Sequence, residues 1–326
     1  EPALPPPESG ALSPELWGLW GSLKVYAVCM TLRLAGQWVW DSWFVSDQGL
    51  HHAFYLQASR ALGDPDRRHR NVSVGHATST DLKNWTVVED AIAISDSPAF
   101  DSYTTWTGSV VKNVDGKWFM FYTGTSREDG GDIQSVGLAT SDDLMTWSKF
   151  SSEALVRSDD RWYAQLDKSA WHDEAFRDPW VFKFSPDDET WHMLVTTREK
   201  NQPNLDSGVM GHATSTDLIN WTVQPPLSKA GAGFAETEVF QFEIVDGVPI
   251  VLFCCSHRWI SAERKQSETG GVYSVATNAD LSELDLSKAV CFDAPGLYAA
   301  RLIRDFDGGW NLIGFWNEPN GSFVGE

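Results

Sequence analysis

The sequence repeats one short pattern, which first appears as VGHATSTDLKNWTVV at residues 74–88. Similar stretches follow as VGLATSDDLMTWSKF (136–150), MGHATSTDLINWTVQ (210–224) and YSVATNADLSELDL (273–286). The copies recur at intervals of roughly 60 to 75 residues, and self-similarity of this kind indicates an architecture built from repeated units. Each copy joins a short β-type run to a polar turn. We interpret the turn as structural, because Asp and Ser hydrogen-bond their own backbone in tight turns.

The segments around each copy read as further short strands. In the second unit, for example, KWFMFYTGTS (117–126) follows an Asp-Gly turn, which is a strong hairpin signal. Many short strands with a long internal period predict an all-β, five-bladed β-propeller with a central, funnel-shaped pocket. Four units precede the four copies, and a C-terminal hairpin begins the fifth, for which residues 21–34 are expected to supply a closing strand. A β-sandwich is the alternative, but it does not explain the recurring turn. The repeated tryptophans are expected to pack between blades: Trp85, Trp147 and Trp221.

Length and composition bound the remaining possibilities. The chain has 326 residues, 42% of them hydrophobic and 21% charged, which is typical of a globular domain. We expect a Pro-rich leader over residues 1–20 and a single catalytic domain over residues 21–326. No apolar run approaches the roughly 20 residues that span a bilayer. The net charge of −20 argues against nucleic acid or an anionic membrane as a partner and fits a neutral or cationic ligand. The partner that we expect is a small molecule or an oligosaccharide. No signal-peptide pattern is visible, and neither compartment nor oligomeric state follows from the sequence.

The four cysteines show no spacing typical of a metal site. They are Cys29, Cys254, Cys255 and Cys291. We expect buried free thiols, with the adjacent Cys254 and Cys255 on opposite faces of one strand.

Acidic residues interrupt the aromatic strands that open three of the units. Asp41 lies in QWVWDSWFV (37–45) and Asp178 in EAFRDPWVF (174–182), while Glu236 and Glu238 lie in AETEVFQF (235–242). The first strand of each propeller blade lines the central channel, so these acids are expected to converge on one pocket. Facing carboxylates suit glycoside chemistry, in which one attacks the sugar and another protonates the leaving oxygen.

The same acids raise the alternative of a metal site. Calcium loops carry their oxygen ligands at close, alternate spacing within one loop. These acids instead lie on separate strands among aromatic residues that can stack on sugar rings, and the chain has 17 Trp. We therefore favour a sugar pocket and expect neither a metal nor a cofactor.

Four motifs carry a resemblance to a known family. VWDSW (39–43), WTGS (106–109), RDP (177–179) and ETE (236–238) resemble, in order, the motif series of glycoside hydrolase family 68. That family contains levansucrases, inulosucrases and some β-fructofuranosidases, and is similar in fold and chemistry to the invertase-type family 32. The resemblance implies a five-bladed propeller and a retaining mechanism through a covalent fructosyl-enzyme intermediate.

The resemblance also implies a role for individual residues. Asp41 would be the nucleophile, Asp178 the transition-state stabiliser and Glu238 the general acid/base. The substrate-binding residues that it implies are Trp40, Trp43, Trp106, Thr107, Arg177, Glu236, Arg258 and Tyr298.

Two departures from the family pattern bear on specificity. Val239 follows the acid/base position, where the family has Arg, and the segments between the blades are short. Both differences concern the acceptor side of the pocket, and they leave hydrolysis or transfer of fructosyl units open. A furanosidase of another specificity, for example for arabinofuranosides, is an alternative. So is a sugar-binding propeller without catalysis, because fold does not imply function.

Overall fold

The chain is an all-β propeller. The computed structural model describes residues 26–27, 32–294, 296–317 and 323–324, which form five four-stranded sheets. The expected leader, residues 1–20, lies outside the described residues. Within the described ranges the helical elements are short 3-10 turns, and none of these helices is long and apolar enough to cross a membrane.

Four sheets are meanders of consecutive strands, in the orders β2-β3-β4-β5, β6-β7-β8-β9, β10-β11-β12-β13 and β14-β15-β16-β17. Their bounds are β2 (Gln37–Asp47), β3 (Leu50–Ser59), β4 (Ser73–Ser79), β5 (Thr86–Val87), β6 (Thr104–Lys112), β7 (Trp118–Thr125), β8 (Gln134–Ser141), β9 (Ser148–Lys149), β10 (Phe176–Phe182), β11 (Trp191–Arg198), β12 (Gly208–Ser215), β13 (Thr222–Gln224), β14 (Glu238–Val245), β15 (Val248–Ser256), β16 (Gly270–Ala276) and β17 (Val290–Cys291). The 3-10 turns are η2 (Arg60–Leu62), η3 (Pro65–Arg70), η4 (Asn204–Asp206), η5 (His257–Trp259), η6 (Arg264–Gln266) and η7 (Leu286–Lys288).

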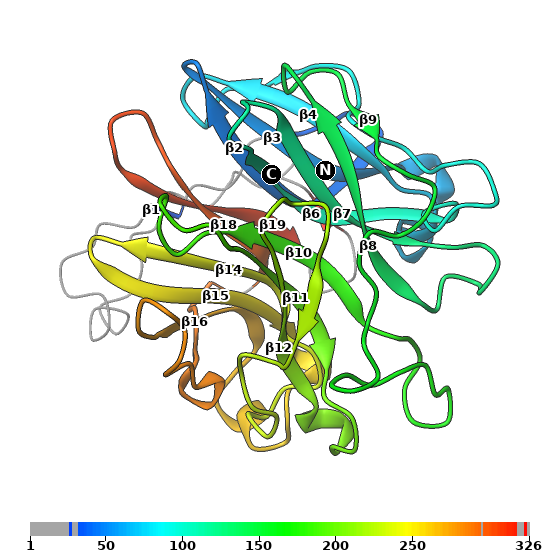
Figure 1. Cartoon of the computed structure of the whole chain (residues 1–326), viewed down its shortest axis with the longest axis vertical. Coiled ribbons are helices and arrows are strands. Elements are labelled where there is room, and N and C mark those ends of the chain that lie inside the picture. Colours follow the sequence, from blue (N-terminus) through cyan, green and yellow to red (C-terminus); the bar gives the residue numbers. More distant parts are fainter. Residues whose placement is uncertain (1–25, 28–31, 295, 318–322, 325–326) are drawn as a thin grey trace, which may run out of the picture.

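The fifth sheet joins the two ends of the chain. β18 (Leu297–Arg304) pairs with β19 (Trp310–Asn317), and β19 also pairs with β20 (Phe323–Val324) and, in parallel, with β1 (Tyr26–Ala27). The expectation that residues 21–34 supply a strand to this sheet is thus confirmed. β18 and β19 lie between the sheets of β2 and β14 (Figure 1). The first strands contact one another in the closed order β2, β6, β10, β14, β18 and back to β2.

The repeated sequence pattern forms the third strand, the turn and the fourth strand of a sheet. In the first copy the Asp81 carboxylate accepts the backbone N–H groups of Lys83 and Asn84, at 2.9 and 2.7 Å. Leu82 adopts the left-handed conformation, with φ of 60°, and buries its side chain in the core. Asp143 and Asp217 cap the equivalent turns in the same way. The structural interpretation of the repeated aspartates is therefore confirmed.

The repeated tryptophans connect neighbouring sheets. Trp147 of the second sheet meets Phe54 of the first edge to face, and Trp221 of the third meets Phe121 of the second in the same way. Trp85 packs on Phe44 of its own sheet, within a cluster that reaches the fifth sheet. Edge-to-face aromatic pairs are a favoured geometry beyond the area that they bury. The tryptophans thus pack the wedge-shaped spaces between the sheets.

The adjacent cysteines of β15 behave as expected. Cys254 and Cys255 are free and buried, and they belong to different hydrophobic clusters on the two faces of the strand. Cys291 is free and half-buried, whereas Cys29 lies outside the described residues.

Each first strand carries a β-bulge at an equivalent position. The shifts in pairing register fall between Val39 and Ser42 in β2, Trp106 and Gly108 in β6, Arg177 and Trp180 in β10, Glu238 and Gln241 in β14, and Tyr298 and Arg301 in β18. A bulge places an extra residue opposite the partner strand and turns its side chain to a new direction. In β2, β6, β10 and β14 the bulge lets two successive side chains face the centre of the molecule. In a regular strand, one of the two would point away from it.

The bulges explain two features of the sequence motifs. Pro179 cannot donate a ladder hydrogen bond, and it lies within the bulge of an edge strand, where proline is tolerated. Gly108 follows the bulge of β6, and a Cβ atom at this position would lie 2.0 Å from the carbonyl oxygen of Phe121. That contact is with backbone of the neighbouring strand, so rotation of a side chain cannot relieve it.

We expect Gly108→Ala to lower the free energy of unfolding by at least about 1–3 kcal/mol, because β6 must move away from β7 to admit the methyl group. Urea denaturation measures this change. Thr86→Ala, on the exposed outermost strand β5, is the control and should stay within about 0.5 kcal/mol of the wild type. Equal midpoints for both variants would contradict the close approach at Gly108.

Candidate active site

The bulged ends of the first strands enclose a pocket of about 390 Å³. Four of the strands contribute the residue at the bulge and the residue before it, and β18 contributes only the residue before its bulge. The pocket is lined by Trp40 and Asp41 of β2, Trp106 and Thr107 of β6, Arg177 and Asp178 of β10, Glu238 and Val239 of β14, and Tyr298 of β18, with Glu236 just before β14. Nine of the residues expected from the sequence, including the three acids, therefore lie around one cavity.

Asp41 is held by a hydroxyl from the neighbouring blade. The Thr107 Oγ1 donates a hydrogen bond of 2.6 Å to the Asp41 Oδ2. Burial raises the pKa of Asp41 to about 6, and the nearby Glu238 adds to the rise, while the Thr107 hydrogen bond and Arg68 oppose it. Asp41 is thus a carboxylate near neutral pH whose protonation is sensitive to this single hydroxyl.

Asp178 is the most enclosed of the three acids, with 4% of its surface exposed. It adopts a left-handed conformation with φ of 57°, and its Oδ2 accepts a hydrogen bond of 2.9 Å from the Thr196 hydroxyl. Its own N–H donates to the Thr123 hydroxyl at 2.8 Å. Burial raises the pKa of Asp178 to about 7, against the opposing charge of Arg177. Strain of this kind persists only where the surroundings over-determine it, and it is concentrated at functional sites.

Arg177 joins the acids of two strands. Its Nη2 lies 2.8 Å from the Glu236 Oε2 and 2.9 Å from the Glu238 Oε1, and its Nε lies 3.6 Å from the Asp178 Oδ2. Burial opposes the Arg177 charge, but Glu236, Glu238 and Asp178 outweigh it and hold the pKa of Arg177 well above its usual range. In return, Arg177 holds the pKa of Glu236 below its usual value despite burial.

The free end of Glu238 has a second partner. The Tyr298 hydroxyl donates to the Glu238 Oε2, from the strand on the other side of β14. Glu238 is thereby clamped between Arg177 and Tyr298, with 24% of its side chain still exposed to the pocket. An acid that is oriented by two donors and open to a ligand has the geometry that proton transfer requires.

Two of the expected substrate contacts lie outside the pocket. Trp43 is fully buried and stacks on Phe54 in the core, because the bulge of β2 turns Asp41 inward and returns the strand to ordinary alternation. Arg258 is exposed on η5, where its guanidinium lies over the ring of Trp259. Trp259 lines the cavity in its place. The expectation of direct substrate contact is therefore corrected for Trp43, and for Arg258 it stays a prediction.

Several lining residues come from loops that the sequence did not single out. Arg68 and His69 belong to η3, and the Arg68 guanidinium lies 5.3 Å from the centre of the Trp40 ring. The Trp106 Nε1 donates to the His69 carbonyl at 2.9 Å, which ties η3 to the pocket wall. The basic run PDRRHR (65–70) in such an acidic chain is the signal that could have found them.

A second group of missed residues lies near the mouth of the pocket. The Gln134 Oε1 accepts a hydrogen bond of 3.1 Å from the Arg177 Nη1, and the Gln134 Nε2 donates one of 2.8 Å to Asp173. Gln134 thus helps to hold the Arg177 guanidinium in place. His172 stacks on Trp259, and both line the cavity. They add an aromatic surface to the wall of the pocket.

The acids do not form an obvious cation site. Arg177 occupies the space between Glu236 and Glu238, where a metal would need carboxylate oxygens free for coordination. Among the described residues, no group of three or more His, Cys, Asp or Glu side chains is arranged to hold a metal ion. The absence of a metal requirement stays a prediction.

A family model connects this geometry to known proteins. The model of the glycosyl hydrolases family 32 N-terminal domain matches residues 41–322. The chain belongs to this family. The match begins at Asp41 itself, and family 32 is the invertase-type family to which family 68 is related.

Individual relatives extend the comparison. The 6(G)-fructosyltransferase of Asparagus officinalis is 30% identical over 208 residues, which cover 62% of this chain and 30% of that protein. The sucrose-6-phosphate hydrolase of Bacillus subtilis (strain 168) is 30% identical over 199 residues, which cover 60% of this chain and 35% of that protein. The chain thus spans about a third of the length of these two curated relatives.

Solved structures show the same fold. The inulosucrase from Halalkalicoccus jeotgali superposes with a TM-score of 0.70 at 19% identity, covering 91% of this chain and 82% of that one. The levansucrase of Bacillus subtilis superposes with a TM-score of 0.65 at 15% identity, covering 89% and 83%. The resemblance to family 68 and its relation to family 32 are consistent with these findings.

The raised pKa of Asp178 predicts how stability changes with pH. A carboxyl whose pKa is higher in the folded protein keeps its proton where the unfolded chain has lost it, so stability falls as pH rises from about 4 to about 7. Asp178→Asn removes this dependence. We expect its free energy of unfolding, relative to the wild type, to rise by about 1.4 kcal/mol per unit of pKa shift between pH 4.5 and pH 8.

Urea denaturation at the two pH values measures this change. Asp115→Asn, in an exposed hairpin turn, is the matched control and should show no comparable rise. A wild-type stability that increases over this range as much as that of Asp178→Asn would contradict the protonation of buried Asp178.

Proposed function

We propose that this protein is a retaining glycosidase that acts on β-fructofuranosides, such as sucrose or a fructo-oligosaccharide. The observation that carries the proposal is the convergence of Asp41, Asp178 and Glu238 in one pocket, with aromatic walls from Trp40 and Trp106. Family membership supports the same chemistry. We further propose that the five sheets act as five blades around a funnel-shaped pocket, and that residues 21–326 form one catalytic unit.

The proposed reaction assigns one step to each acid. The Asp41 carboxylate attacks the anomeric carbon of the fructosyl unit, the bond to the leaving oxygen breaks, and Glu238 gives that oxygen a proton. Water or a sugar hydroxyl then gives its proton to Glu238 and attacks the same carbon, which releases Asp41. Asp178 accepts hydrogen bonds from ring hydroxyls and stabilises the positive charge that develops on the sugar.

The contacts of the pocket support these roles. Thr107 orients the Asp41 carboxylate, and Arg177 and Tyr298 orient Glu238. The charge of Glu238 raises the pKa of Asp41, and the charges of Glu238 and Asp41 raise the pKa of Asp178, so the protonation of Asp41 and of Asp178 depends on their acidic neighbours.

The residue after the acid/base, on the acceptor side of the pocket, favours a second candidate function. Val239 replaces the arginine that the family pattern has after the acid/base, and it lines the pocket with a side chain that cannot donate a hydrogen bond. A pocket that lacks this donor could take a different furanoside, for example an arabinofuranoside. A binding protein without catalysis is the third possibility, and it has no need of a clamped acid opposite Asp41.

Product analysis separates these functions. We expect incubation with sucrose, levan-type oligosaccharides and nitrophenyl arabinofuranosides to release fructose from one of the first two. Equal glucose and fructose from sucrose indicates hydrolysis, and glucose in excess of fructose indicates transfer. Arabinose release alone would favour the second candidate. No release from any substrate, with measurable sugar binding, would favour the non-catalytic propeller.

Asp41→Asn is the variant that tests the nucleophile. We expect kcat to fall by about 10⁴- to 10⁶-fold while the thermal unfolding midpoint is retained, because the amide has the same shape but cannot attack the sugar. Asp47→Asn, at the far end of the same strand, is the matched control and should retain activity. Loss of fold in Asp41→Asn would show a structural role instead.

The Thr107 hydroxyl gives a prediction for the pH profile. Because its hydrogen bond lowers the pKa of Asp41, Thr107→Val should move the acidic limb of the kcat/KM profile to higher pH. Thr107→Ser keeps the hydroxyl and should leave the limb near its wild-type position. Both variants are read from initial rates between pH 4 and pH 8. The same displacement in both would contradict a role for the hydroxyl.

A further inference from the structure

A second cavity lies at the other end of the first strands. It has a volume of about 370 Å³ and is formed by residues that follow the bulges, whereas the candidate active site is formed by residues at the bulges. We call it the back pocket and define it by Phe44 of β2, Trp180 of β10, Glu243 of β14, and Arg301, Phe306 and Trp310 of the fifth sheet and its hairpin. The proposed reaction uses none of these residues.

Arg301 has unsatisfied hydrogen-bonding capacity in this cavity. Its side chain is buried, with 1% exposed, and its Nη1 donates to the carbonyl groups of Val239, at 3.3 Å, and Phe240. Among the described residues, no partner accepts from its Nε or Nη2. A guanidinium has five N–H groups, and a buried N–H without an acceptor costs about 1–3 kcal/mol. A ligand that places oxygen acceptors beside Arg301 would therefore stabilise its buried guanidinium.

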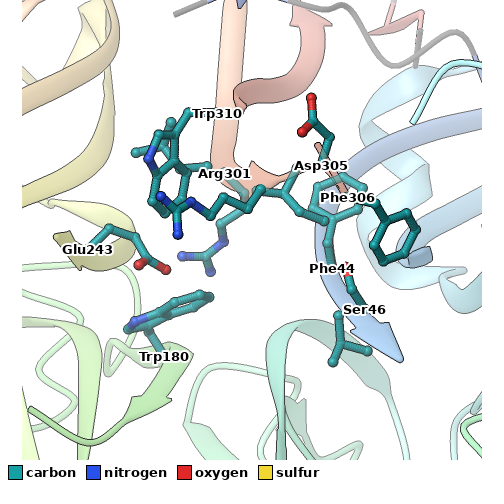
Figure 2. Close-up of a pocket in the computed structure, with 12 residues that line it drawn as sticks. Phe44, Ser46, Trp180, Glu243, Arg301, Asp305, Phe306 and Trp310 are labelled. Carbon is teal, nitrogen blue, oxygen red and sulfur yellow. The ribbon is translucent and has the colours of Figure 1, made fainter. Parts of the chain in front are cut away.

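Glu243 lines the same cavity and provides hydrogen-bond acceptors to complement the donors of Arg301. The carboxyl of Glu243 and the side chain of Arg301 turn toward the same space above the ring of Trp180 (Figure 2). Within the described part of the chain, no ion pair of 4.0 Å or less joins Glu243 to Arg301. Burial raises the pKa of Glu243 to about 7, so near neutral pH it can both accept and donate a hydrogen bond. The gap between the two groups can be bridged by hydroxyls.

Aromatic side chains provide the remaining walls. Trp180 lies beneath the Arg301 guanidinium, at 4.9 Å from the ring centre, and its Nε1 has no hydrogen-bond partner among the described residues. Phe306 is half exposed at the mouth and stacks on His51. Flat apolar faces beside a few polar groups are typical of small-molecule pockets, whose volumes run from about 300 to 1,000 Å³. At 370 Å³ the back pocket suits a single ring.

The charges of the cavity select against an ionic ligand. Arg301 and Arg304 contribute positive charge, while Glu243 and Asp305 oppose it, and all four line the cavity. An anion would meet the two acids, and a cation would meet two guanidinium groups. A neutral molecule with several hydroxyls avoids both costs and satisfies donors and acceptors together.

We propose that the back pocket binds one neutral sugar ring or a comparable cyclic polyol. Its hydroxyls accept from Arg301 and exchange hydrogen bonds with Glu243, and its apolar face packs on Trp180 and Trp310. The site is separate from the candidate active site and does not depend on catalysis.

Equilibrium dialysis of the full chain with radiolabelled fructose and glucose tests this assignment. Glu243→Ala and Trp310→Ala alter the back pocket, and Trp106→Ala alters the candidate active site as the matched control. We expect binding of at least one of the two sugars to include a component that both back-pocket variants lose and Trp106→Ala retains. Glu243→Gln keeps the side-chain volume and Trp310→Phe keeps an aromatic ring. They replace any alanine variant that does not fold, and both should weaken the same component.

Thermal unfolding midpoints establish that the variants are folded. A binding component lost only in Trp106→Ala, or no binding of either sugar to the wild type, would overturn the proposal. So would inorganic phosphate that binds to the back pocket while fructose and glucose do not, because the site would then select for charge rather than hydroxyls.

Discussion

One guanidinium makes it possible for this propeller to hold several acids in a single pocket. Carboxylates that face one another away from water repel, and each loses its hydration. Arg177 contacts Glu236, Glu238 and Asp178 at once, and Gln134 holds it from the outer side. With this cation in place, Glu236 stays charged, Glu238 is oriented and the rise in the pKa of buried Asp178 is limited. The electrostatics of the site thus depend on a residue that the proposed reaction leaves chemically unchanged.

The bulges determine which side chains line the pocket. A regular strand turns alternate side chains to opposite faces, so Trp40 and Asp41, or Arg177 and Asp178, would point apart. One extra residue in β2, β6, β10 and β14 lets both members of a pair line the pocket. The cost appears in the backbone, where non-glycine residues at the bulges take left-handed conformations. These are Asp178, Val239 and Ala299, with φ of 57°, 58° and 47°.

The same bulges divide the centre of the propeller into two cavities. The acids and their aromatic walls lie at the bulged end, and Arg301 and Glu243 lie toward the other end. Arg301 links them, because it lines the back pocket while its Nη1 donates to the carbonyls of Val239 and Phe240, which follow Glu238 directly. The sheets of a propeller radiate from one axis and leave an opening at each end of it, and in this chain polar side chains line both cavities.

The repeat, the strand-rich class and the capped turns could be read from the sequence, because their interactions are local: Asp81 bonds to backbone two and three residues ahead. The acids and most of their partners could also be found, since unusual charges in apolar strands need a shared explanation. Trp43 was placed wrongly, and Arg68 and His69 were missed, because these positions depend on a bulge and on loop packing. The sequence by itself determined which residues carry the chemistry. Only the tertiary structure decided which of them meet, because that depends on contacts between strands about 60 residues apart.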